Sequence, residues 1–146
     1  MFRKFILLSL LVFSSNLYAA CSLEISSGDL LKFNNRKLII DSSCSKFSIY
    51  FQHEGEMAAE IFGHNVVILE TKNFDKVKSR IDMKLGETSG YLPDMPEIIA
   101  KTAIIGGGAK TSVTFDATKL SKGSEYMFFC SFPGHYGAMQ GPVQIL

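Results

Sequence analysis

The feature that most constrains this chain is a strand-like run that ends at a cysteine and leads into a short, ligand-rich loop. Residues 125–130 are apolar or aromatic after Glu125, as in a buried β-strand, and residues 142–145 are typical of the next strand. Between these two runs, Cys130, His135 and Met139 lie within ten residues. The connecting loop must then present a thiol, an imidazole and a thioether to one point.

A second imidazole, that of His64, lies far upstream in the motif Phe-Gly-His-Asn at residues 62–65. Two histidines, a cysteine and a methionine match the ligand set of a blue-copper electron-transfer centre. Sulfur ligands favour Cu(I) and imidazole serves both Cu(I) and Cu(II), so one ligand set can hold both redox states. Zinc is the rival metal, but its structural sites use cysteine and histidine and not methionine. The sequence therefore predicts a copper site.

Each of these residues also has an ordinary interpretation. A cysteine at the end of a strand is commonly a small buried apolar group, and a single methionine is commonly core filler. Their order and spacing together favour the metal. Pro133 and Gly134 support this interpretation, because proline fixes φ and glycine tolerates positive φ, so the loop can turn sharply before His135.

The first 20 residues have the pattern of a secretory signal peptide. Arg3 and Lys4 form a positive start, residues 5–13 are apolar apart from Ser9, and small residues precede Cys21. The apolar run is too short to span a bilayer, which takes about 20 residues. We therefore expect an exported domain over residues 21–146, with no membrane span after cleavage.

The charge of this exported domain excludes one class of partner. Without Arg3 and Lys4, the 15 basic residues of the chain fall to 13 against 14 acidic ones, a net charge of −1. No cluster of basic residues stands out, so the sequence gives no indication of a nucleic-acid partner.

Three cysteines remain after cleavage: Cys21, Cys44 and Cys130. An odd number in an exported protein suggests one disulfide and one thiol with another role. Because Cys130 lies among metal-ligand residue types, a Cys21–Cys44 bond is expected. The alternative is that Cys21 is a lipidated first residue, since Ala-Ala-Cys loosely suits a lipoprotein cleavage site.

Short β-rich runs separated by turn signals predict an all-β sandwich or barrel. The expected strands cover residues 38–40, 47–51, 65–70, 112–115, 125–130 and 142–145. One segment differs: apolar residues recur at helical spacing from Phe74 to Leu85, and Gly86 is a plausible stop. We expect one external helix over residues 73–85, followed by a loop over residues 87–97.

The motifs that carry chemistry also resemble a known family. Residues 126–139, the Phe-Gly-His-Asn motif at 62–65 and Ser-Val-Thr-Phe-Asp at 112–116 are similar to the azurins, bacterial blue-copper proteins of the cupredoxin fold. The resemblance covers the whole exported domain and implies a cupredoxin-type Greek-key β-sandwich. Cys21 and Cys44 fall where azurins have their disulfide.

The resemblance also implies roles for single residues. It implies that His64, Cys130 and His135 are trigonal copper ligands, with Met139 as a distant axial ligand opposite the Gly63 carbonyl. It further implies that Asn65 and Ser131 tie the two ligand loops together, and that Phe132, like them, lies directly behind the copper ligands. An apolar electron-transfer patch is expected around the exposed edge of His135; its members are Met57, Phe62, Phe132, Pro133, Gly134, His135 and Ala138.

The chain also departs from the azurin pattern, in ways that leave the predicted copper site untouched. Lys101 stands where azurins often have a surface histidine, and Tyr136 replaces a smaller residue beside His135. His53 matches a buried azurin histidine that titrates near the site; the alternative is an ordinary histidine at the end of a strand.

These observations predict a periplasmic electron-transfer protein that shuttles single electrons through one Cu(I)/Cu(II) ion and is not an enzyme. The expected partners, by resemblance, are periplasmic redox proteins such as c-type cytochromes or copper nitrite reductase. The alternative function is a copper-binding chaperone or storage protein, which would need exposed, exchangeable ligands. A copper oxidase fragment would need further metal ligands, and only His53 remains for that role.

Overall fold

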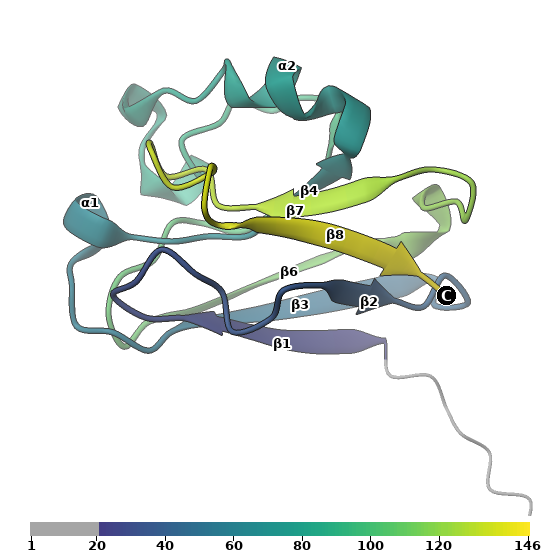
Figure 1. Ribbon diagram of the computed structural model, residues 1–146, viewed down its shortest axis with the longest axis horizontal. Helices are drawn as coiled ribbons and strands as arrows, with labels where there is room; N and C mark the ends of the chain where they lie inside the picture. The colour runs from purple at the N-terminus through teal and green to yellow at the C-terminus, as the bar shows by residue number, and fades with distance from the viewer. Residues whose placement is uncertain (1–20) are drawn as a thin grey trace, which may run out of the picture.

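The computed structural model describes residues 21–146, which form two β-sheets packed face to face (Figure 1). One sheet has the strand order β1-β3-β6 and the other the order β2-β8-β7-β4-β5. The strands are β1 Ser22–Ser27, β2 Leu38–Ile40, β3 Lys46–His53, β4 Val67–Glu70, β5 Ile98–Lys101, β6 Lys110–Asp116, β7 Tyr126–Phe129 and β8 Gln140–Ile145. The expected all-β sandwich is confirmed, and the expected signal peptide, residues 1–20, lies outside the described residues.

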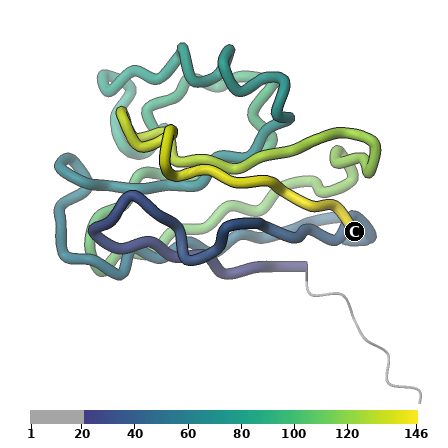
Figure 2. Tube along the Cα trace, viewed as in Figure 1, coloured from purple at the N-terminus to yellow at the C-terminus, as the bar shows by residue number. Residues whose placement is uncertain are grey.

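Most connections between consecutive strands cross from one sheet to the other, whereas β4–β5 and β7–β8 stay within the five-stranded sheet. β1 pairs with β3 and β2 with β8 in parallel, whereas the other pairings are antiparallel. Consecutive strands such as β2 and β3 belong to different sheets, and the chain trace in Figure 2 follows these crossings. Such crossings are those of a Greek-key sandwich, in which a strand returns by a long connection to a distant neighbour.

Strand β7 is buried on both of its faces, which explains why its sequence is apolar without alternation. Tyr126 and Phe128 point into the core between the two sheets. Met127 and Phe129 point to the other face, into a second apolar cluster that also contains Val77. The five-stranded sheet therefore separates two cores, and the cysteine of the predicted site directly follows its strand β7.

The second core is covered by a flap, residues 71–94, on the outer face of the five-stranded sheet (Figure 1). The predicted external helix is here but is shorter than residues 73–85: α2 spans Phe74–Lys78, with 3-10 turns at Thr71–Asn73, Met83–Leu85 and Glu87–Ser89. Ser79 bonds the Lys76 carbonyl through its hydroxyl, and the Asp82 carboxylate accepts the Lys84 amide. Such local side-chain bonds compete with a continuous helix, so the segment breaks into turns.

Three elements were not expected from the sequence: strands β1 and β5, and the short helix α1, Ala59–Phe62. A further 3-10 turn covers Ala117–Lys119. α1 lies at the same end of the sandwich as the β7–β8 connection, and the C-terminus lies at the opposite end (Figure 1). No helix within residues 21–146 is both long and apolar enough to cross a membrane.

The expected disulfide is confirmed. Cys21 and Cys44 are bonded, with a Cα–Cα distance of 5.7 Å, and the bond joins the start of β1 to the segment before β3. Cys130 is the free cysteine of the described chain and is fully buried.

Candidate metal centre

Three donor side chains meet at the end of the sandwich: His64, Cys130 and His135. The two Nδ1 atoms are 3.1 Å apart, and the Cys130 Sγ lies 3.9 Å from each of them. A point equidistant from these three atoms is about 2.1 Å from each, close to the roughly 2.0–2.3 Å bonds that histidine and cysteine make to a metal ion. The donor atoms therefore fit a copper ion, and the predicted convergence of these three residues is confirmed.

His64 is oriented by hydrogen bonds on both its backbone and its ring. Its backbone exchanges two bonds with Ile105, and its Nε2 donates to the Gly28 carbonyl over 2.9 Å. The bond to Gly28 leaves a lone pair on Nδ1, the atom that faces the other two donors. Burial lowers the pKa of His64 to about 4, so the ring is neutral and ready to bind a metal at pH 7.

Cys130 directly follows β7 and has no exposed surface. Burial raises the pKa of its thiol to about 12, although backbone N–H groups of Asn65 and Phe132 oppose this shift by donating to the sulfur. The metal-free protein therefore keeps a protonated thiol at pH 7. Because the thiolate is the metal ligand, copper uptake must release this proton.

His135 is held by the tight loop between β7 and β8. Its backbone N–H donates to the Phe132 carbonyl over 3.0 Å, and its backbone carbonyl accepts from the N–H groups of Ala138 and Met139. Gly134, just before it, has φ +84°, a left-handed conformation that glycine adopts without cost. The loop thus turns where the Pro-Gly pair predicts, and it directs the imidazole inward. Burial lowers the pKa of His135 as well.

Aromatic rings surround the imidazoles. The Phe132 ring stacks on His135 at 4.3 Å between centroids, and Phe62 packs against the same imidazole at 4.8 Å. His53 is fully buried and stacks on His64 at 4.9 Å. The His53 ring bonds the Gly55 N–H and the Phe62 carbonyl, so it supports the site without joining the donor cluster.

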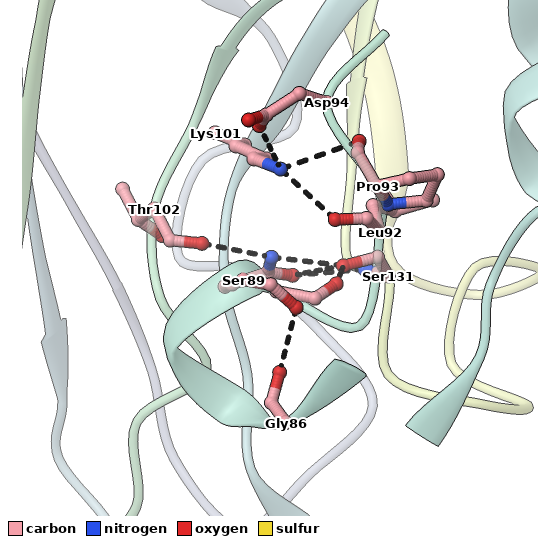
Figure 3. A network of polar contacts seen from close by, with 10 residues as sticks. Gly86, Ser89, Leu92, Pro93, Asp94, Lys101, Thr102 and Ser131 are labelled. Atoms are coloured by element: carbon pink, nitrogen blue, oxygen red, sulfur yellow. Dashed lines mark hydrogen bonds and ion pairs between the residues drawn. The ribbon is translucent and has the colours of Figure 1, made fainter. Parts of the chain in front are cut away.

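A buried polar network links the two ligand-bearing segments (Figure 3). The Asn65 amide nitrogen donates to Ser131 Oγ over 2.8 Å and to the Thr102 carbonyl over 3.1 Å, while its oxygen accepts from the Ser131 N–H. Ser131 Oγ in turn donates to the Gly90 carbonyl over 2.6 Å. Asn65 and Ser131 have no exposed surface. The residues after His64 and Cys130 are therefore tied together.

The two predicted axial groups lie close by in the chain. Met139 is fully buried; its N–H donates to the His135 carbonyl and its carbonyl accepts from Cys130. Gly63 is buried as well, and a Cβ there would lie 2.4 Å from both the Ala59 carbonyl and the Ile104 side chain, so only glycine fits. Their axial roles stay a prediction.

The residues of the predicted electron-transfer patch differ in how far they are exposed. Met57, Gly134 and Ala138 are exposed, and Phe62 and Pro133 are half-buried. Phe132 lies underneath, 8% exposed, and His135 itself is 5% exposed. Of the donor side chains, His135 is therefore the one that reaches the surface.

Several supporting residues could not be found from the sequence. The carbonyls of Gly28, Gly90 and Thr102 orient His64, Ser131 and Asn65 through backbone atoms, which leave no signature in residue type. A glycine at position 90 is the one partial signal, because a Cβ there would lie 2.8 Å from the Asn65 amide nitrogen.

Comparison with known proteins identifies the family of this chain. Residues 19–146 match the family model of copper binding proteins, plastocyanin/azurin family. An azurin of Pseudomonas aeruginosa is 40% identical, covering 99% of both chains, and an azurin of Alcaligenes faecalis is 39% identical, covering 86% of this chain and 98% of its own. A solved azurin (Az-iso2) from Methylomonas sp. strain J superposes with a TM-score of 0.81 at 35% identity, covering 88% of this chain and 99% of the other. This chain therefore belongs to the plastocyanin/azurin family of copper-binding proteins.

Proposed function

We propose that His64, Cys130 and His135 hold one copper ion in a trigonal arrangement, with Met139 and the Gly63 carbonyl as weak axial ligands, and that the chain carries single electrons in the periplasm. The observation that carries this proposal is the convergence of the three donor atoms at 3.1 and 3.9 Å. When bound, copper supplies the one-electron couple between Cu(II) and Cu(I).

The protein's contribution is a dry and rigid site. All three donor side chains are buried, and each is fixed by hydrogen bonds or ring contacts to the protein. A set of ligands held in place by packed neighbours changes little between redox states, which favours fast electron transfer. Buried, fixed ligands argue against a chaperone or storage role, in which the metal must be released readily.

The proposed role is that of a carrier and not of an enzyme. Within residues 21–146, the cluster that could hold a metal consists of His64, Cys130 and His135. His53, the remaining histidine, is engaged with Gly55 and Phe62. This arrangement supports one metal centre, with His53 in a supporting role.

Electrons would enter and leave at the outer edge of His135. The exposed residues beside it, Gly134, Gly137 and Ala138, carry no charge, and Met57 adds apolar surface. A small apolar patch supports the weak, rapidly released contacts of redox encounters. Periplasmic c-type cytochromes or copper nitrite reductase are the proposed partners.

The periplasmic location rests on the signal-peptide pattern of residues 1–20 and on the Cys21–Cys44 bond, which an oxidising compartment permits. The mass of the protein recovered from the periplasm tests it. A chain that begins at or near Cys21 supports the proposal, and a full-length cytoplasmic chain contradicts it.

Electron self-exchange between copies tests the patch. Ala138→Asp places a charge on the exposed surface beside His135, so we expect slower self-exchange with an unchanged visible spectrum. Ser45→Asp adds the same charge at an exposed position beside Cys44, away from the metal site, and is the matched control. Equal self-exchange rates for both variants and the unmodified protein would show that electrons pass through another face.

A further inference from the structure

The most unusual backbone conformation in the described chain lies in the flap, next to the metal site. Tyr91 has φ +56°, and among residues 21–146 it is the one non-glycine residue with positive φ. A bulky side chain in this region is strained, and such strain persists only where surrounding contacts hold it. Gly90, just before it, also has positive φ, at +66°. Two consecutive left-handed residues therefore form a tight turn.

Contacts hold this turn from both sides. On one side, Ser131 Oγ donates to the Gly90 carbonyl over 2.6 Å. The backbone of Tyr91 is also engaged, since its N–H donates to the Gly86 carbonyl and its carbonyl accepts from the Asp82 N–H. The turn is thus joined directly to the residue that follows Cys130.

On the other side, Lys101 forms hydrogen bonds to the three residues after Tyr91 (Figure 3). Its Nζ lies 2.9 Å from the Leu92 carbonyl, 3.3 Å from the Pro93 carbonyl and 3.1 Å from the Asp94 carboxylate. Three acceptors match the three protons of an ammonium group. The Lys101 side chain is only 20% exposed, whereas that of Asp94 is fully exposed, so the bonds to the two carbonyls are the protected part of this arrangement.

The Tyr91 ring leads from this turn to the metal site. The side chain is 1% exposed and packs edge-to-face on Phe132, with centroids 5.8 Å apart. Phe132 in turn stacks on the His135 imidazole at 4.3 Å. Contacts therefore run without a break from the strained turn through the rings of Tyr91 and Phe132 to the His135 imidazole.

We propose that Tyr91 is a positioning residue for His135, and that Lys101 is the clamp that keeps Tyr91 in its strained conformation. The inference rests on the proposed role of His135 as a copper ligand. The line of contact restricts the His135 imidazole, the ligand nearest the surface, and so limits copper loss and changes of geometry at that edge.

Lys101→Met tests the clamp, because methionine keeps an unbranched apolar stem and loses all three donors. Lys76→Met is the matched control: it removes the ion pair that joins Lys76 of the same flap to Glu97, away from Phe132 and His135. We expect Lys101→Met to lose copper to a chelator about 2- to 10-fold faster, the factor for weakening one aromatic contact. Its copper hyperfine splitting in electron paramagnetic resonance should also change, whereas the control should match the unmodified protein.

Two substitutions at Tyr91 distinguish the role of its ring from that of its hydroxyl group. Tyr91→Phe keeps the ring and loses only the hydroxyl that faces Glu87, so it should behave as the unmodified protein. Tyr91→Asn loses the ring, and asparagine tolerates the left-handed conformation. We expect Tyr91→Asn to reproduce the faster copper loss and the altered hyperfine splitting of Lys101→Met.

Nuclear magnetic resonance of the metal-free protein gives an independent readout. Relaxation of the His135 ring nitrogens should show greater motion in Tyr91→Asn and Lys101→Met than in Tyr91→Phe and Lys76→Met. If Tyr91→Asn only lowers stability, with unchanged hyperfine splitting and ring motion, the positioning role is refuted. If the unmodified protein binds no copper, the proposed function fails, while the ring motion in the metal-free protein still decides whether Tyr91 positions His135.

Discussion

Truncation of Asn65 should destabilise this protein more than any comparable change outside the apolar core. Asn65 is fully buried, and its amide holds the Ser131 N–H, the Ser131 hydroxyl and the Thr102 carbonyl. In Asn65→Ala, the Ser131 N–H and the Thr102 carbonyl lose these bonds inside the protein. Each buried group left without a partner costs about 1–3 kcal/mol. For these two groups together, we expect the free energy of unfolding to fall by about 4 kcal/mol.

Urea unfolding of the metal-free protein, with the disulfide intact, measures this loss without any contribution from copper binding. Ser48→Ala is the control, because it removes a hydroxyl that bonds Thr114 on the exposed side of β3, and it should cost less than about 0.5 kcal/mol. A loss below about 1 kcal/mol in Asn65→Ala would refute the reasoning, since it would mean that water or a shifted side chain satisfies the vacated groups.

Ser131→Ala completes the comparison. It removes the hydroxyl bonds to Asn65 and Gly90, but Asn65 keeps its bonds to the Thr102 carbonyl and the Ser131 N–H. The single change should therefore cost less than Asn65→Ala. Because the two side chains belong to one network, the double variant should lose less than the sum of the two single losses.

Three further predictions concern the axial ligand, the disulfide and acid stability. Met139→Leu should keep copper and colour and raise the reduction potential, because the axial bond is long and weak; complete loss of copper would make Met139 a primary ligand. Cys44→Ala should lower the free energy of unfolding by about 3 kcal/mol and leave the visible spectrum unchanged, since the bond spans a sequence separation of 23; an altered spectrum would contradict this. The free energy of unfolding of the metal-free protein should be constant above about pH 6.5 and fall by about 3 kcal/mol as the pH drops towards 4. The reason is that the pKa of His64 is lowered to about 4, so between these pH values only the unfolded chain binds that proton. Urea unfolding at several pH values measures this, and the absence of such a loss would contradict the burial of His64.

The metal site was largely predictable because its ligands are chemically distinctive. Cys130, His135 and Met139 share one loop, and His64 follows a glycine that leaves room for α1 to pack closely. The strands with the strongest signals, β4 and β7, are those buried on both faces, where apolar residues are needed at every position. These features are local, so the sequence alone displays them.

The weaker elements depend on partners that are distant in the sequence. β1 is rich in serine and forms through its parallel pairing with β3, and β5 is a short strand at the edge beside β4. The helix expected over residues 73–85 followed from apolar spacing, which Ser79 and Asp82 override through local hydrogen bonds.

The left-handed turn at Tyr91 illustrates the same limit most clearly. Nothing in its own residue type predicts positive φ, which tyrosine disfavours. Its conformation depends on Lys101 and Ser131, which are 10 and 40 residues away in the chain. Only the folded structure brings these groups together.

Titration of the metal-free protein with Cu(II), followed by visible absorption, tests the central claim most directly. We predict an intense blue colour that saturates at one copper ion per chain, with release of the Cys130 proton, because only a thiolate gives strong charge transfer to Cu(II). Cys130→Ser should remain folded and colourless under the same conditions. A colourless unmodified protein, or a serine variant that is equally blue, would contradict the assignment of the site.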